Sequence, residues 1–373
     1  MPIIAHCAAC AAELVETAPR CVRCHTRYCD AACQHEHWAN GHKKKCKRIA
    51  RAGGAEPYHA DLKFKEAAAQ AVERCAAELP ADAICYVCRC DASTEGIVRG
   101  CACRGTAGLV HLSCLTKKAR VEAEDSLGRA GTVGSWMGCG LCDGSWYGPV
   151  MIAMGWACWK TYMSRPDHDG CHGAAMLFLT HCLGEGREAL PVVKAYVASL
   201  QRVVDSTLHY NPLDLQPLRV AQKKLAECYF GSGQPDEALR LMRSVYTDGL
   251  RIFGPSSEDT FNAAEQLAGF LIRASDEGFF EAKTLLRKHL PSARRTLAPD
   301  AEARIKLAKM YAVTIYIHAD QSDTCRDDRF EAVSILEKIV RVQRRKKGPN
   351  HPSTKHTQSI LDEFRQKNAR CYP

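Results

Sequence analysis

The chain has 373 residues, of which 46% are hydrophobic and 25% are charged, and its formal net charge is +9. This length allows two or three domains, and the composition excludes a fibrous or low-complexity chain. The most apolar window, residues 149–159, is shorter than the roughly 20 residues that cross a bilayer, so we expect no membrane span.

The 22 cysteines are the most unusual feature of the composition. The chain begins without the basic segment and apolar run of a signal peptide, so we expect a protein of the cytoplasm or nucleus. Disulfides are rare in those compartments, and cysteines paired at short spacings there indicate metal binding. Most of the pairs fall within residues 1–145, which predicts metal sites in that part of the chain.

Residues 1–50 hold four pairs of potential metal ligands. The pairs are Cys7 and Cys10, Cys21 and Cys24, Cys29 and Cys33, and His42 and Cys46. The two wider spacings suit a helix, where residues i and i+4 share a face. The basic run 43–48 has two interpretations, a nuclear-targeting or nucleic-acid segment and the solvated end of a helix, and we favour the helix end.

The stretch from Tyr28 to Gln34, followed by Trp38 and by His42-Lys43-Lys44-Lys45-Cys46, resembles a MYND zinc finger. That family interleaves its ligand pairs. The resemblance therefore implies one zinc on Cys7, Cys10, Cys29 and Cys33, and a second zinc on Cys21, Cys24, His42 and Cys46. It also implies a groove that binds short proline-containing peptides.

Residues 51–80 are predicted to be a helical linker. Apolar residues recur at helical intervals from Asp61 to Leu79, and Pro80 ends the pattern. We expect the face with Leu62, Ala69 and Val72 to pack between the fingers, without chemistry of its own.

Residues 81–148 hold a second set of ligand pairs. These are Cys85 and Cys88, Cys101 and Cys103, His111 and Cys114, and Cys139 and Cys142. Eight ligands fill two closed tetrahedral zinc sites and leave no open position for a catalytic water. We therefore expect structural metal in this segment.

His111 is the only histidine among these eight ligands and the fifth in order. This order, together with the run from Cys103 to Leu115, closely resembles the RING-CH (RINGv) finger of MARCH-type ubiquitin ligases. The interleaving of that family implies one zinc on Cys85, Cys88, His111 and Cys114. It places the other zinc on Cys101, Cys103, Cys139 and Cys142.

The same resemblance implies that a ubiquitin-conjugating enzyme docks near Val87, Gly140 and Leu141, and that the finger has no catalytic side chain of its own. The chain departs from the family at Lys118, where a tryptophan is usual four residues after the sixth ligand. Trp136, three residues before the seventh ligand, is a candidate to fill a similar space. The membrane spans usual in MARCH-type ligases are not expected here.

The two fingers together predict four structural zinc ions. Binding them through fourteen thiolates would change the formal charge from +9 to +3, so nucleic acid is not an expected partner. A domain of about 40 residues buries too little apolar surface to fold alone, and zinc supplies the missing stability.

Residues 149–373 show an internal repeat in which Glu-Ala recurs at 188–189, 237–238, 281–282 and 331–332. Helical patterns flank each dipeptide, at 215–230, 236–253, 259–274 and 280–297, which predicts a solenoid of helical hairpins. A polar loop is expected at 320–328, and the final helix, 354–369, is expected to cap the stack without a partner. The starts at Gly254-Pro255 and Gly348-Pro349 resemble the tetratricopeptide (TPR) repeats of kinesin light chains, which implies a concave peptide-binding face.

The predicted fold is therefore two small zinc-stabilised finger domains followed by an all-α, TPR-like solenoid, with divisions at 1–50, 51–80, 81–148 and 149–373. We favour a RING-type ubiquitin ligase whose MYND finger and repeats bind a client protein that the sequence does not identify. One alternative is an interaction scaffold without transfer activity, and another is a chromatin- or transcription-linked adaptor. No segment resembles a SET domain, so methyl transfer is not predicted.

Overall fold

The computed structural model describes residues 3–15, 17–80, 82–93, 95–125, 133–166, 169–206, 215–322 and 326–371. The chain divides into two compact units, Met1–Tyr210 and Asn211–Pro373, which are described separately. In the first unit the elements are α1 (Ala31–His37), a π-helical turn η1 (Trp38–His42), α2 (Lys43–Arg51), α3 (Ala55–Ala76), β1 (Ile97–Val98), β2 (Val110–His111), α4 (Leu112–Asp125), α5 (Gly134–Met137), α6 (Gly148–Tyr162), α7 (Gly170–Leu183) and α8 (Ala189–Ser206).

The N-terminal finger has a very small core. Its buried cluster contains Leu14, Tyr28 and Ile49 besides four cysteines, Cys7, Cys21, Cys24 and Cys46. Three apolar side chains bury too little surface to hold such a domain together in water. The fold of residues 3–50 therefore depends on what its cysteines bind.

Helix α3 is longer at its start than the sequence predicted, and it buries a different face. It begins at Ala55, after Gly54 with φ +114°, instead of at Asp61. Its buried residues are Ala60, Ala67 and Ala71, whereas Leu62 is 42% exposed. Small side chains are buried on this face because they allow α3 to lie close along α6.

The second finger is built around a two-stranded antiparallel hairpin in which β1 and β2 pair Ile97 with His111 and Val98 with Val110. Two glycines join this finger to the helices beside it. A Cβ on Gly96 would lie 2.4 Å from Val72 of α3, and one on Gly100 would lie 2.4 Å from Val150 of α6. The finger is thus fixed against both helices by contacts that only glycine permits.

Helices α6, α7 and α8 complete the first unit. The sequence predicted a solenoid from residue 149, but these three helices belong to the first unit. Helix α6 packs there on α3, α4 and α5. A Cβ at Gly155 of α6 would lie 2.8 Å from Sγ of Cys182 of α7, so these two helices approach closely. Cys158, Cys171 and Cys182 are buried here among apolar side chains, where a free cysteine acts as a small hydrophobic residue.

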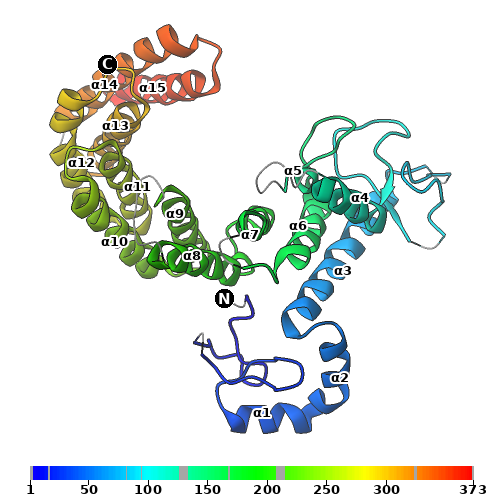
Figure 1. Ribbon diagram of the computed structural model, residues 1–373. Helices are drawn as coiled ribbons and strands as arrows, with labels where there is room; N and C mark the ends of the chain where they lie inside the picture. The colour runs from blue at the N-terminus through cyan, green and yellow to red at the C-terminus, as the bar shows by residue number, and fades with distance from the viewer. Residues whose placement is uncertain are drawn as a thin grey trace. The chain divides into compact units, whose positions relative to one another are not determined.

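The second unit consists of paired helices that stack in chain order (Figure 1). They are α9 (Gln216–Gly231), α10 (Pro235–Phe253), α11 (Glu258–Ala274), α12 (Asp276–Thr296), α13 (Glu302–Ser322), α14 (Arg326–Lys347) and α15 (Pro352–Cys371). The predicted bounds agree closely except at α12. This helix begins four residues early, because the side chain of Ser275 accepts a hydrogen bond from the backbone N–H of Gly278 and caps it.

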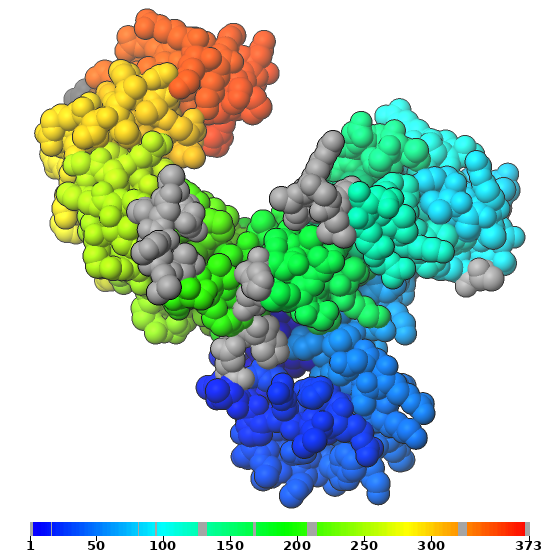
Figure 2. Space-filling model, in the orientation of Figure 1, coloured from blue at the N-terminus to red at the C-terminus, as the bar shows by residue number. Residues whose placement is uncertain are grey.

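The alanines of the repeated Glu-Ala dipeptide are fully buried at all four positions, Ala189, Ala238, Ala282 and Ala332. Buried apolar side chains pack between successive pairs of the second unit, and its space-filling surface runs on from one pair to the next (Figure 2). The helical hairpins therefore form the TPR-like solenoid that the repeat predicted.

Two expectations for the end of the chain were wrong. Helix α15 has partners, because it packs on α14 and because Phe364 stacks on Tyr316 of α13 with ring centroids 3.5 Å apart. The predicted loop at 320–328 is mostly helical, since α13 continues to Ser322 and α14 begins at Arg326. Residues 323–325 lie outside the described residues.

Candidate metal centres

Each Cys-x2-Cys pair forms the same tight turn. In all four turns, the backbone N–H of the residue after the second cysteine donates to the carbonyl of the first, at 2.9–3.0 Å. That residue is in the left-handed region each time, at Ala11, His25, Arg89 and Asp143. No other non-glycine residue of the described segments has a positive φ. A left-handed conformation costs a non-glycine residue about 1 kcal/mol, so these four strained positions mark where the sulfur atoms are held.

The remaining ligands lie on or beside helices. The carboxylate of Asp30 caps α1 by accepting from the backbone N–H of Cys33 at 2.8 Å. Gly41, with φ +112°, breaks the path between α1 and α2 and turns His42 inward, where it is buried. In the second finger, His111 ends β2 and Cys114 follows it on the first turn of α4.

The structure brings the sixteen candidate residues together as four groups of four. The ligand atoms within each group lie within 4.8 Å of one another. The groups are Cys7, Cys10, Cys29 and Cys33; Cys21, Cys24, His42 and Cys46; Cys85, Cys88, His111 and Cys114; and Cys101, Cys103, Cys139 and Cys142. These are the interleaved sets that the two family resemblances implied.

The distances suit zinc. A tetrahedral ion with Zn–S bonds of about 2.3 Å separates its sulfur atoms by about 3.8 Å. Sγ of Cys21 and Cys46 lie 3.8 Å apart, and so do those of Cys103 and Cys139. Nε2 of His42 lies 3.3 Å from Sγ of Cys24. The four groups therefore fit four structural zinc ions.

The thiols of one group cannot all ionise without a cation. Although burial opposes it, backbone N–H groups of Cys10, Ala9 and Cys29 lower the pKa of Cys7 to about 6. Burial and the neighbouring thiols Cys10 and Cys7 raise the pKa of Cys33 far above its usual range. A bound Zn²⁺ removes this conflict by replacing the protons.

The two histidines are held differently. Nδ1 of His111 lies 3.3 Å from Sγ of Cys88, and its Nε2–H donates to the carbonyl of Asp91 at 2.9 Å. This second bond fixes the tautomer that presents Nδ1 to a metal. His42 faces its group with Nε2, and its Nδ1 is buried without a hydrogen-bond partner among the described residues. The ring packs instead beside His37 and Trp38.

The residues expected to contact a conjugating enzyme are exposed on the second finger. Val87 is 41% exposed and Leu141 is 55% exposed. Lys118 of α4 forms an ion pair with Glu122 at 2.5 Å, and its Nζ lies 3.7 Å from where a Cβ of Gly140 would stand. Burial, followed by the charges of Cys139 and Glu122, raises the pKa of Tyr86, the neighbour of Val87, to about 12.

Trp136, the candidate to fill the space of the missing family tryptophan, is buried. Its side chain is 1% exposed, and its ring lies edge-on to Tyr162 of α6, with centroids 6.3 Å apart. It belongs to the core between the finger and the helices. The surface at Lys118 is therefore charged where the family usually has an aromatic ring.

Comparison with known protein families agrees with this arrangement. The profile of the MYND finger matches residues 7–46, and the profile of the RING-variant domain matches residues 85–142. The chain thus contains both fingers. No curated protein matches this chain.

Several solved structures are similar to this chain. One contains nearly identical TPR-like repeats of a kinesin light chain from Podosopora anserina, with 24% identity, a TM-score of 0.36, and coverage of 48% of this chain and 80% of that one. Another is BtubC (BKLC) from P. vanneervenii, with 16% identity, a TM-score of 0.43, and coverage of 60% and 87%. The solenoid assignment rests on the helix packing described above.

Within the described segments, no helix combines the length and the apolar character that crossing a bilayer requires. The chain combines two zinc-binding fingers with a stack of helical hairpins, and it is therefore a protein-interaction module.

Proposed function

We propose that this protein is a RING-type ubiquitin ligase that acts in the cytoplasm or nucleus. Its RING-variant domain docks a ubiquitin-conjugating enzyme, and its MYND finger and solenoid hold a client protein. The observation that carries the proposal is the set of ligands in residues 85–142, whose order and grouping are those of the RING-variant domain. We also propose that the sixteen clustered side chains are the zinc ligands.

The zinc ions in this proposal have no part in the chemistry. Four protein ligands close each tetrahedral site, so each ion stabilises a turn and offers no open position to substrate. The second finger supplies no nucleophile or general base. Transfer is accelerated because the loaded conjugating enzyme and the client lysine are held on one chain, which raises their effective concentration.

The proposed docking surface comprises Val87 on one zinc turn and Gly140 and Leu141 on another, with Lys118 of α4 beside Gly140. Exposed apolar side chains on rigid turns are suited to bury against a partner, because little conformational entropy is lost on binding. The metal groups make these turns rigid. Trp38, which is 38% exposed beside His42, is the corresponding candidate for peptide binding by the MYND finger.

Autoubiquitination by the purified full chain, assayed with a panel of conjugating enzymes, tests the proposal. We expect activity that Val87→Ala reduces by about tenfold, the effect of losing one apolar contact at a small interface. Val22→Ala is the matched control, since Val22 is also an exposed valine in a zinc turn, in the other finger. No transfer with any conjugating enzyme, despite full zinc content, would contradict the proposal.

A scaffold without transfer activity is the second candidate, and the Lys118–Glu122 ion pair favours it. This pair is polar and solvated where the family usually presents an aromatic ring. Lys118→Trp separates the two functions. If the chain is a ligase with weakened docking, the substitution raises the transfer rate several-fold; a scaffold stays inactive with either residue.

A further inference from the structure

The first unit has a cavity of about 490 Å³ where helices α3, α4 and α6 meet beside α5 (Figure 1). This volume lies within the range of about 300–1,000 Å³ that is usual for small-molecule sites. All of the residues that line the cavity belong to the first unit, and none of them is one of the sixteen clustered metal-ligand candidates. The cavity is therefore separate from both the metal centres and the solenoid.

One part of the cavity is apolar. Phe64 of α3, Trp136 of α5 and Ala157 of α6 line it. Trp136 is buried, whereas Phe64 is only half-buried, so part of the Phe64 ring is open to a ligand. A planar ring that stacks on such a side chain, or meets its edge, is stabilised beyond the area that it buries. This wall therefore favours an aromatic ligand.

Two bases at the cavity have no acidic partner. Lys117 and Arg120 are exposed on α4, and residues three apart on a helix have Cβ atoms about 5–6 Å from each other, so both can reach one anion. Among the described residues neither forms an ion pair or a hydrogen bond, and Glu124, one turn beyond Arg120, does not pair with it. The other charged residues of the cavity, Lys160 and Asp61, pair with each other at 2.5 Å. The cavity thus has two more positive charges than negative ones.

Two threonines add hydrogen-bond acceptors. Oγ1 of Thr116 donates to the carbonyl of Ser113 at 3.0 Å, and Oγ1 of Thr161 donates to the carbonyl of Ala157 at 2.9 Å. Each hydroxyl hydrogen is thus in use, while each oxygen can still accept. The cavity therefore suits a ligand that has O–H or N–H groups in addition to an anionic group.

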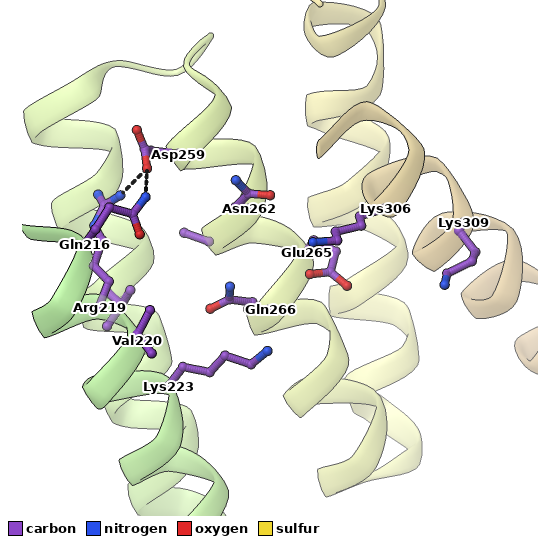
Figure 3. A pocket seen from close by; sticks show the side chains of 12 residues that line it. Gln216, Arg219, Val220, Lys223, Asp259, Asn262, Glu265, Gln266, Lys306 and Lys309 are labelled. Atoms are coloured by element: carbon purple, nitrogen blue, oxygen red, sulfur yellow. Dashed lines mark hydrogen bonds and ion pairs between the residues drawn. The ribbon is translucent and has the colours of Figure 1, made fainter. Parts of the chain in front are cut away.

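The lysines of the solenoid groove shown in Figure 3 differ from these bases, because acidic side chains lie close to them. The charges of Lys306 and Lys309 both act on Glu265, and they also act on Glu302. The two bases of the α4 cavity have no such neighbours among the residues that line it, apart from the acid already paired with Lys160. Excess positive charge is therefore a particular property of the cavity in the first unit.

The cavity also lies apart from the proposed docking surface for a conjugating enzyme. Thr116 and Arg120 each stand two residues from Lys118 in the sequence, which is a rotation of about 200° around a helix. They therefore lie on the opposite side of α4 from Lys118. A ligand in the cavity would be a function of this chain in addition to ubiquitin transfer.

We propose that this cavity binds a small aromatic phosphate monoester of about the size of a mononucleotide. Lys117 and Arg120 receive the phosphate, whose charge of about −1.5 to −2 at pH 7 matches the excess positive charge. The guanidinium of Arg120 has the geometry to bind two phosphate oxygens. The planar ring lies against Phe64, and the oxygens of Thr116 and Thr161 accept hydrogen bonds from the hydroxyl or amine groups of the ligand.

Isothermal titration calorimetry with the full-length, zinc-loaded protein tests the proposal. The probe is adenosine monophosphate, and its controls are adenosine, which lacks the phosphate, and ribose phosphate, which lacks the ring. We expect each control to bind at least about tenfold more weakly than the probe. Equal binding of adenosine, or no saturable binding of the monophosphate up to about 1 mM, would overturn the proposal.

Two double variants locate the site. Lys117→Ala with Arg120→Ala is expected to weaken binding of the monophosphate by at least about tenfold, and both side chains are exposed, so the fold should be kept. Lys306→Ala with Lys309→Ala is the matched control, since it removes the same charge from the groove of Figure 3 and should have little effect. An equal loss in both double variants would indicate nonspecific attraction and overturn the proposal.

Phe64→Leu tests the ring of the ligand with a readout that a merely structural role would not give. This variant stays apolar but loses the planar side chain, so binding of adenosine monophosphate should fall toward that of ribose phosphate, which itself should not change. An equal loss for both ligands would contradict the assigned role of Phe64 and the aromatic class of the ligand. Tighter binding of a phosphotyrosine peptide than of the monophosphate would indicate a protein ligand and overturn the small-molecule assignment.

Discussion

The carbonyl of Asp91 accepts a hydrogen bond from Nε2 of His111 at 2.9 Å, while the other ring nitrogen faces Cys88 at 3.3 Å. This pairing leaves the imidazole a single tautomer and one orientation. The corresponding histidine of the first finger, His42, has no such support, since its Nδ1 is buried without a hydrogen-bond partner in the part of the chain that the structure describes. The imidazole of His111 is therefore more firmly oriented than that of His42, although both groups have three sulfur atoms and one nitrogen.

This difference predicts unequal effects of the same substitution. His111→Cys removes the hydrogen bond to Asp91, so we expect a loss of about 1 kcal/mol in the free energy of unfolding of the second finger. His42→Cys adds the same thiolate charge but breaks no hydrogen bond and removes an unsatisfied buried nitrogen. We expect it to cost less. Zinc transfer to a competing chelator, followed for each variant, measures the difference, and a larger loss from His42→Cys would contradict the argument.

Zinc removal should unfold the fingers and leave the solenoid folded. Four of the seven buried residues in the core of the first finger are cysteines of its metal groups, and each structural zinc supplies about 10–16 kcal/mol in small domains. After chelation, we expect proteases to cut within residues 1–145 while most of the helical circular dichroism persists. Elemental analysis of the untreated chain should give four zinc ions. Resistance of the chelated fingers to proteolysis would contradict this expectation.

Much of this architecture could be predicted from the sequence, because ligand spacing and helical periodicity are local signals. The helices at 216–231, 235–253 and 258–274 begin and end within one residue of their predicted limits. The sixteen ligand candidates also stand out by spacing alone. Which ligand pairs share one zinc is predicted by the family resemblance, because spacing alone permits other groupings.

What the sequence did not reveal depends on contacts between distant residues. The buried face of α3 is set by how closely α6 approaches, which favours Ala67 over Leu62. The hydrogen bond from His111 to Asp91 joins residues twenty positions apart. The left-handed residues after each Cys-x2-Cys pair include an arginine and an alanine, which carry no local signal for that conformation.

Gly278→Ala should destabilise the solenoid, because α11 and α12 meet there with no room for a side chain. A Cβ at this position would lie 2.0 Å from the carbonyl oxygen of Leu271, a backbone atom that cannot move aside alone. We expect a loss of at least about 2 kcal/mol, in the range of overpacked cores. Urea unfolding monitored through α11 and α12 by hydrogen exchange measures it.

Gly269→Ala is the matched control on α11. Its Cβ would meet only Cε of Met310, at 3.5 Å, which is ordinary van der Waals contact. Alanine is also favoured over glycine inside a helix by about 1 kcal/mol. This variant should be neutral or slightly more stable than the wild type, and equal destabilisation by the two alanines would show that close helix approach is not the cause.

The pH dependence of the solenoid should depend on Glu265. Burial raises the pKa of this carboxyl above its ordinary value of 4.5, against the opposing charges of Lys223, Lys306 and Lys309. A group whose pKa is higher in the folded state is protonated there while it is ionised in the unfolded chain, so folding is favoured less as pH rises through that window. Above the folded-state pKa, the full cost of the buried charge remains.

Glu265→Gln removes this titration and keeps the size of the side chain. We therefore expect the protection of α11 amides in the wild type to fall as pH rises from about 4.5 through the raised pKa, once the intrinsic pH dependence of exchange is corrected. The variant should keep nearly constant protection over the same range. Hydrogen exchange resolved to α11 is the appropriate measurement, because acid also releases zinc from the fingers and would dominate any global unfolding signal. Parallel curves for the wild type and the variant would contradict the raised pKa of Glu265 in the folded chain.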